Sequence, residues 1–410
     1  KMRIRIAALL LTGLRLSLTG TAQTAPDWPV VGQLKTRDAK EINASTWSIG
    51  GETLDRDYTD YQSWKTYLGP LGAKRIRLQG GWAKTEKVKG QYDFAWLDAV
   101  IPDAAGRGVA PWVELSYGNP IYGPGGGEAK LMGRIPTSAE GLTAWDAWVR
   151  AMVTRYQRYV PEWEIWNEPD GNPLNTGTEL GHFYIRTARL VKSIQPNARL
   201  IALGMASVTK LDWLRDFFEV LKKENALDLV DILTYHGYAH NPDSSYPKIE
   251  EMRKLVWSYN PKIVFMQGEN GAPSTAKPIG ALRDQDWTEL SQAKWDLRRM
   301  LGDHGRGIAT NLFTISDIHY AAGDHMVGVN TKGLLKTNPD KTIERPKLAY
   351  RAAQHVFSLF DDQIELLGKS KPTVSQETVA AFHYRHKRSG GSLVTLWSGE
   401  ARPAETYEPK

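Results

Sequence analysis

The sequence predicts an α/β fold, a (β/α)₈ TIM barrel with a small all-β module after it. From about residue 42, short apolar segments rich in β-branched residues alternate with longer helical segments. Eight strand–helix units with near-continuous apolar strands indicate a parallel sheet covered by helices and closed into a barrel. Beyond residue 361 the pattern changes to short strands with a glycine-containing turn, which indicates a second module.

The barrel is expected to span residues 42–360. Its predicted strands are Ile42–Ile49, Lys74–Gln79, Val109–Ser116, Glu162–Asn167, Arg199–Leu203, Val230–Tyr235, Ile263–Gln267 and Ile308–Ile315. Its predicted helices are Tyr58–Leu68, Phe94–Ala105, Ser138–Tyr159, Glu179–Ile194, Asp212–Glu224, Lys248–Tyr259, Trp287–Gly302 and Pro346–Leu359. A doubly wound open sheet is the alternative, but it usually has a glycine-rich phosphate turn after its first strand. Here that strand is followed only by the pair Gly50-Gly51, which favours the barrel.

Residues 361–410 are expected to form part of a sandwich-like β module. Thr378–His386 and Ser392–Trp397 have strand character, and Arg388–Gly391 has turn character. A whole sandwich takes roughly 100 residues. We therefore expect either that residues 26–41 add strands to this module or that the module is truncated.

The first 25 residues have the pattern of a signal peptide. A basic start, Lys1–Arg5, precedes an apolar run, Ile6–Leu18, and a stretch of small residues, Thr19–Ala25. The apolar run is too short to span a bilayer, and no later stretch approaches a membrane span. The sequence contains no cysteine, which excludes disulfides, Cys-ligated zinc and a thiolate nucleophile. These features predict a secreted or periplasmic bacterial protein.

The charge pattern argues against nucleic-acid binding. The formal net charge is +6, and the first 25 residues contribute four basic side chains and no acid. The remainder has no run of five basic residues, whereas binding to a polyanion needs clustered charge.

Two glutamates at strand exits are the candidate catalytic residues, because working groups in barrel enzymes lie at the C-terminal ends of the strands. The fourth strand exits through Trp166-Asn167-Glu168-Pro169, where the proline is expected to hold Glu168 near extended geometry. The seventh exits through Gly268-Glu269-Asn270-Gly271. Alternatively, Glu168 is a surface acid in a turn, and Glu269 caps the next helix or binds a cation. Position on strands 4 and 7 of one barrel favours a pair of carboxyl groups at one mouth.

Such a pair suits glycoside hydrolysis, which needs one carboxyl group protonated and one ionised. A separation of about 5–5.5 Å makes the ionised group a nucleophile and retains the anomeric configuration.

The motifs resemble those of clan A glycoside hydrolases, and most closely family 39, the family of β-xylosidases and α-L-iduronidases. The resemblance spans roughly residues 45–360 and rests on Trp166–Pro169, the strand-7 glutamate, Gly90–Phe94 with Leu97-Asp98, Pro111–Ser116 and Thr234–Tyr238. The run Gly268-Glu269 departs from the Thr-Glu usual in the family.

The resemblance implies a retaining enzyme in which Glu168 is the acid/base and Glu269 the nucleophile. It also implies that Asn167 hydrogen-bonds the sugar 2-hydroxyl and that His236 and Tyr238 line the mouth. Arg77, at the exit of strand 2, would keep a nearby carboxylate ionised. The expected activity is that of an exo-acting β-xylosidase. The alternatives are an endo-acting enzyme, another specificity (β-galactosidase, arabinosidase or glucanase) and a non-catalytic carbohydrate-binding barrel.

Sugar rings present apolar faces that stack on indole rings. Trp82, after strand 2, and Trp166 are therefore expected as platforms at the mouth, and the alternative is that they fill the core. The sequence shows no metal-binding, nucleophile-elbow or phosphate-loop motif, so we expect no metal and no cofactor.

Overall fold

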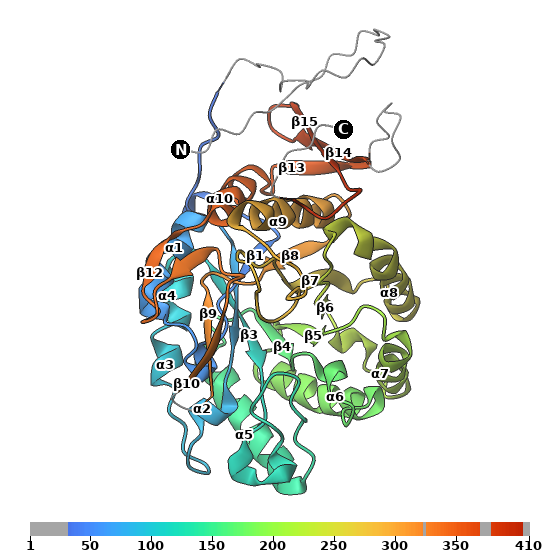
Figure 1. The fold of residues 1–410 in the computed structure, drawn as a ribbon. Helices are drawn as coiled ribbons and strands as arrows, with labels where there is room; N and C mark the ends of the chain where they lie inside the picture. The colour runs from blue at the N-terminus through green and yellow to red at the C-terminus, as the bar shows by residue number, and fades with distance from the viewer. Residues whose placement is uncertain (1–31, 323–324, 370–378, 405–410) are drawn as a thin grey trace.

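The computed structural model describes residues 32–322, 325–369 and 379–404 (Figure 1). The predicted signal peptide, 1–25, lies outside the described residues. Eight parallel strands close into a barrel in chain order, which confirms the predicted fold class. They are β1 (Trp47–Gly50), β2 (Arg75–Gln79), β3 (Ala110–Leu115), β4 (Glu162–Ile165), β5 (Arg199–Met205), β6 (Ile232–Tyr235), β7 (Val264–Asn270) and β8 (Ala309–Leu312).

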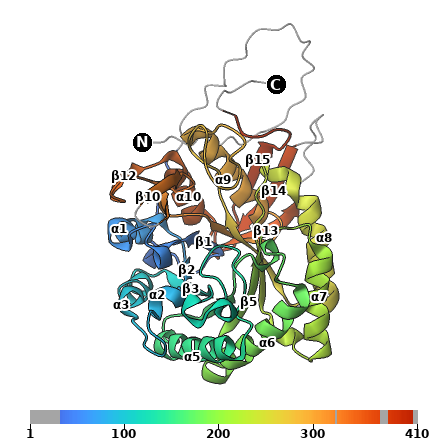
Figure 2. The same ribbon diagram turned by 60° about the horizontal axis from the view of Figure 1, so that its bottom comes forward.

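Helices surround the barrel, as Figures 1 and 2 show. They are α1 (Tyr61–Leu71), α2 (Trp82–Thr85), α3 (Ala95–Asp98), α4 (Ile101–Gly106), α5 (Ala139–Tyr156), α6 (Gly177–Ile194), α7 (Leu211–Lys223), α8 (Tyr246–Tyr259), α9 (Glu289–His304) and α10 (Leu348–Leu359). The predicted helix Phe94–Ala105 is two short helices, α3 and α4, and the first strand begins at Trp47 rather than at Ile42. A 3₁₀ turn, Ala39–Glu41, capped by Asp38, comes just before Ile42, where the first strand was predicted to begin.

Large apolar side chains fill the barrel. One buried cluster joins five strands across the interior: Trp112, Ile201, Ile232, Met266 and Ala309. Such a layer closes a barrel of this size as a packed core rather than a pore. Polar groups on the same strands therefore gather at their C-terminal ends, where the loops leave the barrel.

Two hairpins that sequence analysis did not predict lie between β8 and α10. The first pairs β9 (Ile318–Ala322) with β10 (His325–Asn330), and the second pairs β11 (Leu335–Thr337) with β12 (Ile343–Pro346). These two hairpins follow the C-terminal end of strand 8.

A three-stranded antiparallel sheet follows the barrel: β13 (Ile364–Lys369), β14 (Val379–His386) and β15 (Ser392–Ser398). The Tyr384 ring packs against His304 and Phe360, with centroid distances of 5.3 and 5.2 Å. In the N-terminal segment, the described residues 32–46 contain no strand, and Arg37 pairs with Asp361 at 2.7 Å. Within the described residues, no helix is both long and apolar enough for a membrane crossing.

Candidate active site

Glu168 lies three residues beyond β4 in a left-handed backbone conformation (φ 50°, ψ 43°). The expectation of extended geometry is therefore wrong. The Glu168 N–H donates to the carbonyl oxygen of Gly204 on β5 at 3.0 Å, and this long-range bond overrides the local preference before proline. A non-glycine residue in this region stores about 1–3 kcal/mol, and such residues cluster at functional sites.

The Glu168 carboxyl group is buried and bound to histidine. The residue is 7% exposed, and Oε1 lies 2.8 Å from His236 Nδ1. Burial raises the pKa of Glu168 above its ordinary value, and the hydrogen bond and charge of His236 oppose that rise. The charge of Glu269 adds to it. A carboxyl group of this kind holds its proton to higher pH, as a general acid must.

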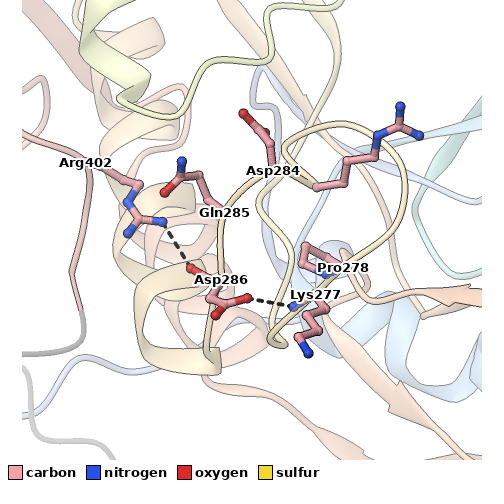
Figure 3. A pocket seen from close by; sticks show the side chains of 7 residues that line it. Lys277, Pro278, Asp284, Gln285, Asp286 and Arg402 are labelled. Atoms are coloured by element: carbon pink, nitrogen blue, oxygen red, sulfur yellow. Dashed lines mark hydrogen bonds between the residues drawn. The ribbon is translucent and has the colours of Figure 1, made fainter.

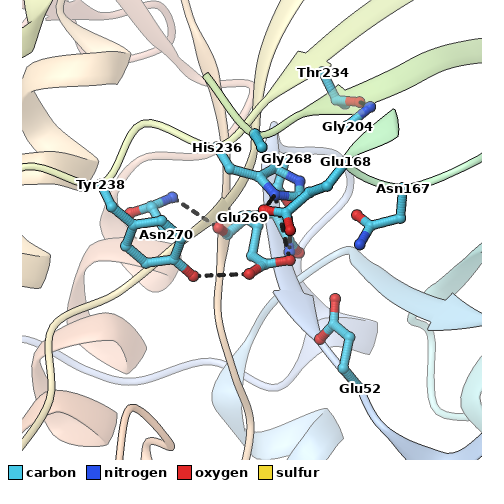
Figure 4. A network of polar contacts seen from close by, with 12 residues as sticks. Glu52, Asn167, Glu168, Gly204, Thr234, His236, Tyr238, Gly268, Glu269 and Asn270 are labelled. Carbon is cyan, nitrogen blue, oxygen red and sulfur yellow. Dashed lines mark hydrogen bonds and ion pairs between the residues drawn. The ribbon is translucent and has the colours of Figure 1, made fainter. Parts of the chain in front are cut away.

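Glu269 lies within β7 rather than after it, and its side chain is 13% exposed. Tyr238 donates its hydroxyl to Oε1 at 2.9 Å, and Arg77 Nη1 donates to Oε2 at 3.2 Å. His236 Nδ1 lies 3.5 Å from Oε2. One oxygen of Glu168, one nitrogen of His236 and one oxygen of Glu269 all lie within 4.8 Å of one another (Figure 4). The structure thus brings together the two predicted glutamates.

Arg77 connects these residues to three further acids. The guanidinium is fully buried and hydrogen-bonds to four carboxylates and one amide. The acceptors are Glu164 Oε2 (2.7 Å), Glu52 Oε1 (3.1 Å), Glu269 Oε2 (3.2 Å), Asn167 Oδ1 (2.8 Å) and Glu114 Oε2. This set, with Arg77 at its centre, is called the Arg77 network below. The predicted role of Arg77 beside a carboxylate fits this geometry.

Two acids of the Arg77 network are only partly ionised near neutral pH. Burial raises the pKa of Glu52 to about 7 and that of Glu114 to about 8, and the charge of Arg77 opposes both rises. Sequence reasoning did not select Glu52, although it follows the exit of strand 1. The Gly50-Gly51 pair was a usable signal, because a Cβ on Gly50 would lie 2.1 Å from the Glu52 carboxyl oxygen.

Asn167 is buried between donors and acceptors of the same site. Its Oδ1 accepts from Arg77, and its Nδ2 donates to the Tyr117 hydroxyl at 2.8 Å. Gly204, with φ +48°, permits this packing, because a Cβ there would lie 3.1 Å from Asn167 Oδ1 and 3.2 Å from His236 Nε2. Buried His236 has a raised pKa: burial itself acts to lower it, and the two glutamates together outweigh that effect.

A pocket of about 320 Å³ opens beside the glutamate pair. Asn167 and Glu269 line it among the predicted residues. The other lining residues, which sequence reasoning missed, are Thr53, Arg56, Tyr58, Gln79, Ala129, Lys130, Leu131, Phe313 and Tyr320. Apart from Gln79 at the end of β2 and Tyr320 on β9, they lie on loops after β1, β3 and β8, so no local motif marks them.

The two tryptophans predicted as sugar platforms are fully buried, so that prediction is wrong. Trp82 stacks on Tyr122 with a centroid distance of 5.5 Å and donates to Glu86 Oε2 at 2.5 Å. Trp166 packs against Trp145 at 5.6 Å. Trp145 and Trp148 of helix α5 pack on these two indoles, so both belong to the core.

A larger hollow, about 590 Å³, lies on the β7–α9 loop (Figure 3). Its lining residues are Lys277, Pro278, Arg283, Asp284, Gln285, Asp286 and Arg402. It contains none of the predicted site residues. Arg402 donates to the Asp286 carbonyl at 3.0 Å, which attaches the C-terminal segment to this loop.

The donor set that could hold a divalent cation within the described residues is Glu168, His236 and Glu269. Its members already pair with one another, with Tyr238 and with Arg77. The arrangement therefore suits proton and glycosyl transfer through the side chains themselves.

Comparison with known proteins shows which family this chain resembles. Residues 72–260 match the model of the glycosyl hydrolases family 39. The match covers somewhat less than half of the chain and supports a glycoside hydrolase. The matched segment holds Arg77, Glu168 and His236, whereas Glu269 follows it on the same barrel.

The chain is 31% identical over 135 residues to β-galactosidase BgaA of Clostridium cellulovorans. That match covers 28% of this chain and only a fifth (20%) of the relative's length. A family 39 glycoside hydrolase from Bacteroides cellulosilyticus WH2 superposes with a TM-score of 0.65 at 17% identity, covering 89% of this chain and 72% of that chain. SrfJ from Salmonella typhimurium superposes with a TM-score of 0.58 at 12% identity, covering 89% and 83%. Likeness at such identity shows a shared fold.

Proposed function

We propose that this chain is a retaining glycoside hydrolase that cleaves β-linked glycans by double displacement. The observation that carries the proposal is the pair of carboxyl groups at the barrel mouth, with oxygens within 4.8 Å of each other. Retaining enzymes hold the two groups about 5–5.5 Å apart, whereas inverting enzymes leave about 6.5–9.5 Å for a water molecule. The observed spacing supports retention.

In the first step, a Glu269 oxygen attacks the anomeric carbon while Glu168 gives its proton to the glycosidic oxygen. The carbon–oxygen bond breaks, the leaving group departs as an alcohol, and a glycosyl ester forms on Glu269. In the second step, Glu168 takes a proton from water, the water oxygen attacks the anomeric carbon, and Glu269 is released as a carboxylate.

The surroundings of each carboxyl group support these roles. Glu168 has a raised pKa from burial, which suits the acid. Glu269 accepts hydrogen bonds from Arg77 and Tyr238, which stabilise a carboxylate and aim its oxygens. Asn167 is held by Arg77 beside the pair, where its amide can meet the sugar 2-hydroxyl.

We propose further that the enzyme is exo-acting and β-xylosidase-like. A pocket of about 320 Å³, lined largely by loops after three strands, supports binding of a chain end rather than of a long polymer. β-Galactosidase activity is the second candidate, because the curated relative is named for it. An endo-acting enzyme would require a groove open at both ends.

A panel of nitrophenyl β-glycosides tests the specificity, and NMR of the first product tests the stereochemistry. Release of the β-anomer supports retention, and release of the α-anomer contradicts it. Glu269→Ala and Glu168→Ala should each abolish most turnover. With an activated leaving group, azide should restore the activity of Glu168→Ala and form a β-glycosyl azide, because azide needs no general base.

The same assay addresses the non-catalytic alternative. A binding barrel would retain oligosaccharides without hydrolysing any member of the panel. The basic and apolar start of the sequence supports export, and we propose a secreted or periplasmic location, which cell fractionation would test.

A further inference from the structure

Lys332, two residues after β10, is a buried cation without a hydrogen-bond partner among the described residues. It is 1% exposed, and its Nζ contacts no acceptor among the residues that the structure describes. The β7–α9 loop covers it: a Cβ on Gly280 would lie 3.5 Å from Nζ. Burying an ammonium group without hydrogen bonds costs folding free energy, so a functional role has to be considered for it.

The surroundings of Lys332 lead to the candidate active site. Nζ lies 5.7 Å from the centre of the Tyr238 ring, within reach of a cation–π interaction. The hydroxyl of the same tyrosine donates to Glu269 Oε1 at 2.9 Å. Asp296 on α9 is the other acid whose charge acts on the ammonium, and it is also buried.

The charges around Glu269 suggest a role for Lys332. In the Arg77 network a single guanidinium serves four carboxyl groups, one of them Glu269. With Glu52 and Glu114 protonated, two carboxylates still share one cation. The charge of Glu269 acts on Lys332, and an interior of low dielectric constant strengthens the attraction between a buried ammonium and this carboxylate.

We propose that Lys332 is a positioning residue of the active site, a second buried cation that acts across the Tyr238 ring to keep Glu269 ionised. This inference rests on the proposed function, in which Glu269 must be a carboxylate to attack. Burial lowers the pKa of Lys332 to about 7, so the lysine is charged at acidic pH, where a nucleophilic carboxylate is most readily lost to protonation.

Several other groups face Glu269 and set the background for this effect. They are Glu52 after β1, Arg77 on β2, Glu168 after β4, His236 and Tyr238 after β6 and Tyr320 on β9. The test must therefore change the Lys332 charge alone. Lys332→Met keeps the length and apolar stem of the side chain and removes only the ammonium.

The experiment measures kcat/KM against pH for wild type and K332M with an activated nitrophenyl glycoside. The acidic limb should move to higher pH by about one unit, a shift expected of a buried unit charge acting through a tyrosine. One unit below the wild-type limb, the variant should therefore be up to about tenfold slower. Above about pH 8 the two profiles should converge, because Lys332 has then lost its proton.

Two lysine variants serve as controls. K336M changes an exposed lysine on β11 that pairs with Glu344 at 2.9 Å, and it should leave the profile unchanged. K347M removes a buried lysine that pairs with Asp317 at 2.6 Å; it should lower the melting temperature without moving the acidic limb. A limb that stays in place in folded K332M overturns the inference, and so does an equal loss at every pH. Full activity of Glu269→Ala would overturn the proposed function instead.

Discussion

Replacing Glu52 with glutamine should stabilise the protein at alkaline pH and change little at acidic pH. Glu52 is 1% exposed, and burial raises its pKa from 4.5 to about 7. The folded state therefore binds this proton more tightly than the unfolded state does. The associated stability is fully present below about pH 4.5 and is lost as the pH rises through about 7.

The expected magnitude follows from that shift. A rise from 4.5 to about 7 corresponds to about 3 kcal/mol between the two protonation states. E52Q has the shape of the protonated acid and can still accept from Arg77, but it cannot ionise. Its free energy of unfolding relative to wild type should therefore increase by about 3 kcal/mol between pH 4 and pH 8.

Urea unfolding followed by tryptophan fluorescence at a series of pH values measures this difference. Glu140→Gln, a change on α5 at a side chain that is 61% exposed, provides the control and should stay within about 0.5 kcal/mol of wild type throughout. A difference between E52Q and wild type that does not change with pH would refute the reasoning, because it would mean that the pKa of Glu52 is the same in the folded and unfolded states.

Three further changes test other parts of the structure. Tyr238→Phe removes one donor to the Glu269 carboxylate and should lower kcat/KM about 10- to 100-fold with little change in melting temperature; unchanged kinetics would contradict the contact. Trp82→Ala should lower the free energy of unfolding by about 3–5 kcal/mol and leave KM unchanged, whereas a raised KM at full stability would restore the platform role. Burial lowers the pKa of His304 from 6.5 to about 4. The free energy of unfolding of the wild type should therefore fall by up to about 3 kcal/mol as the pH falls from about 6.5 to about 4. His304→Phe should flatten that loss in urea unfolding, and an equally steep loss in the variant would argue against a buried neutral histidine.

The barrel could be predicted from sequence because its signal is local and repeated. All eight predicted strands overlap observed ones, and strand order then fixed the face on which Glu168 and Glu269 lie. The hairpins β9–β10 and β11–β12 were not predicted, because their short strands lie outside the barrel sheet and show no barrel period.

The side-chain contacts could not be predicted in the same way. Arg77 bonds to acids that are 25 to 192 positions away in the chain, and no spacing in the sequence records such distances. Trp82 and Trp166 stand at strand exits as sugar-stacking residues do, but helix α5 covers them, and only tertiary packing decides between the two outcomes. The extended conformation predicted for Glu168 was wrong for a related reason, since a hydrogen bond to the Gly204 carbonyl sets its backbone.

The proposed catalytic role explains why the Arg77 network, whose buried charges are costly to desolvate, lies in the centre of this fold. The network rests on the apolar layer of the barrel, where Trp112 donates to Glu164 and carries the Arg77 guanidinium 5.6 Å from its ring. Replacing buried ion pairs by apolar groups is often neutral or stabilising, so stability alone does not account for four acids around one arginine. A catalytic carboxylate, however, must be ionised, fixed in direction and shielded from water at once, and fixed dipoles and charges achieve this without reorganisation during the reaction. On this view Glu52 and Glu114 hold the guanidinium in place and remain largely protonated so that they do not compete for its charge. The stabilising effect expected of E52Q at high pH and the acidic-limb shift expected of K332M are therefore two measurements of one balance of charge.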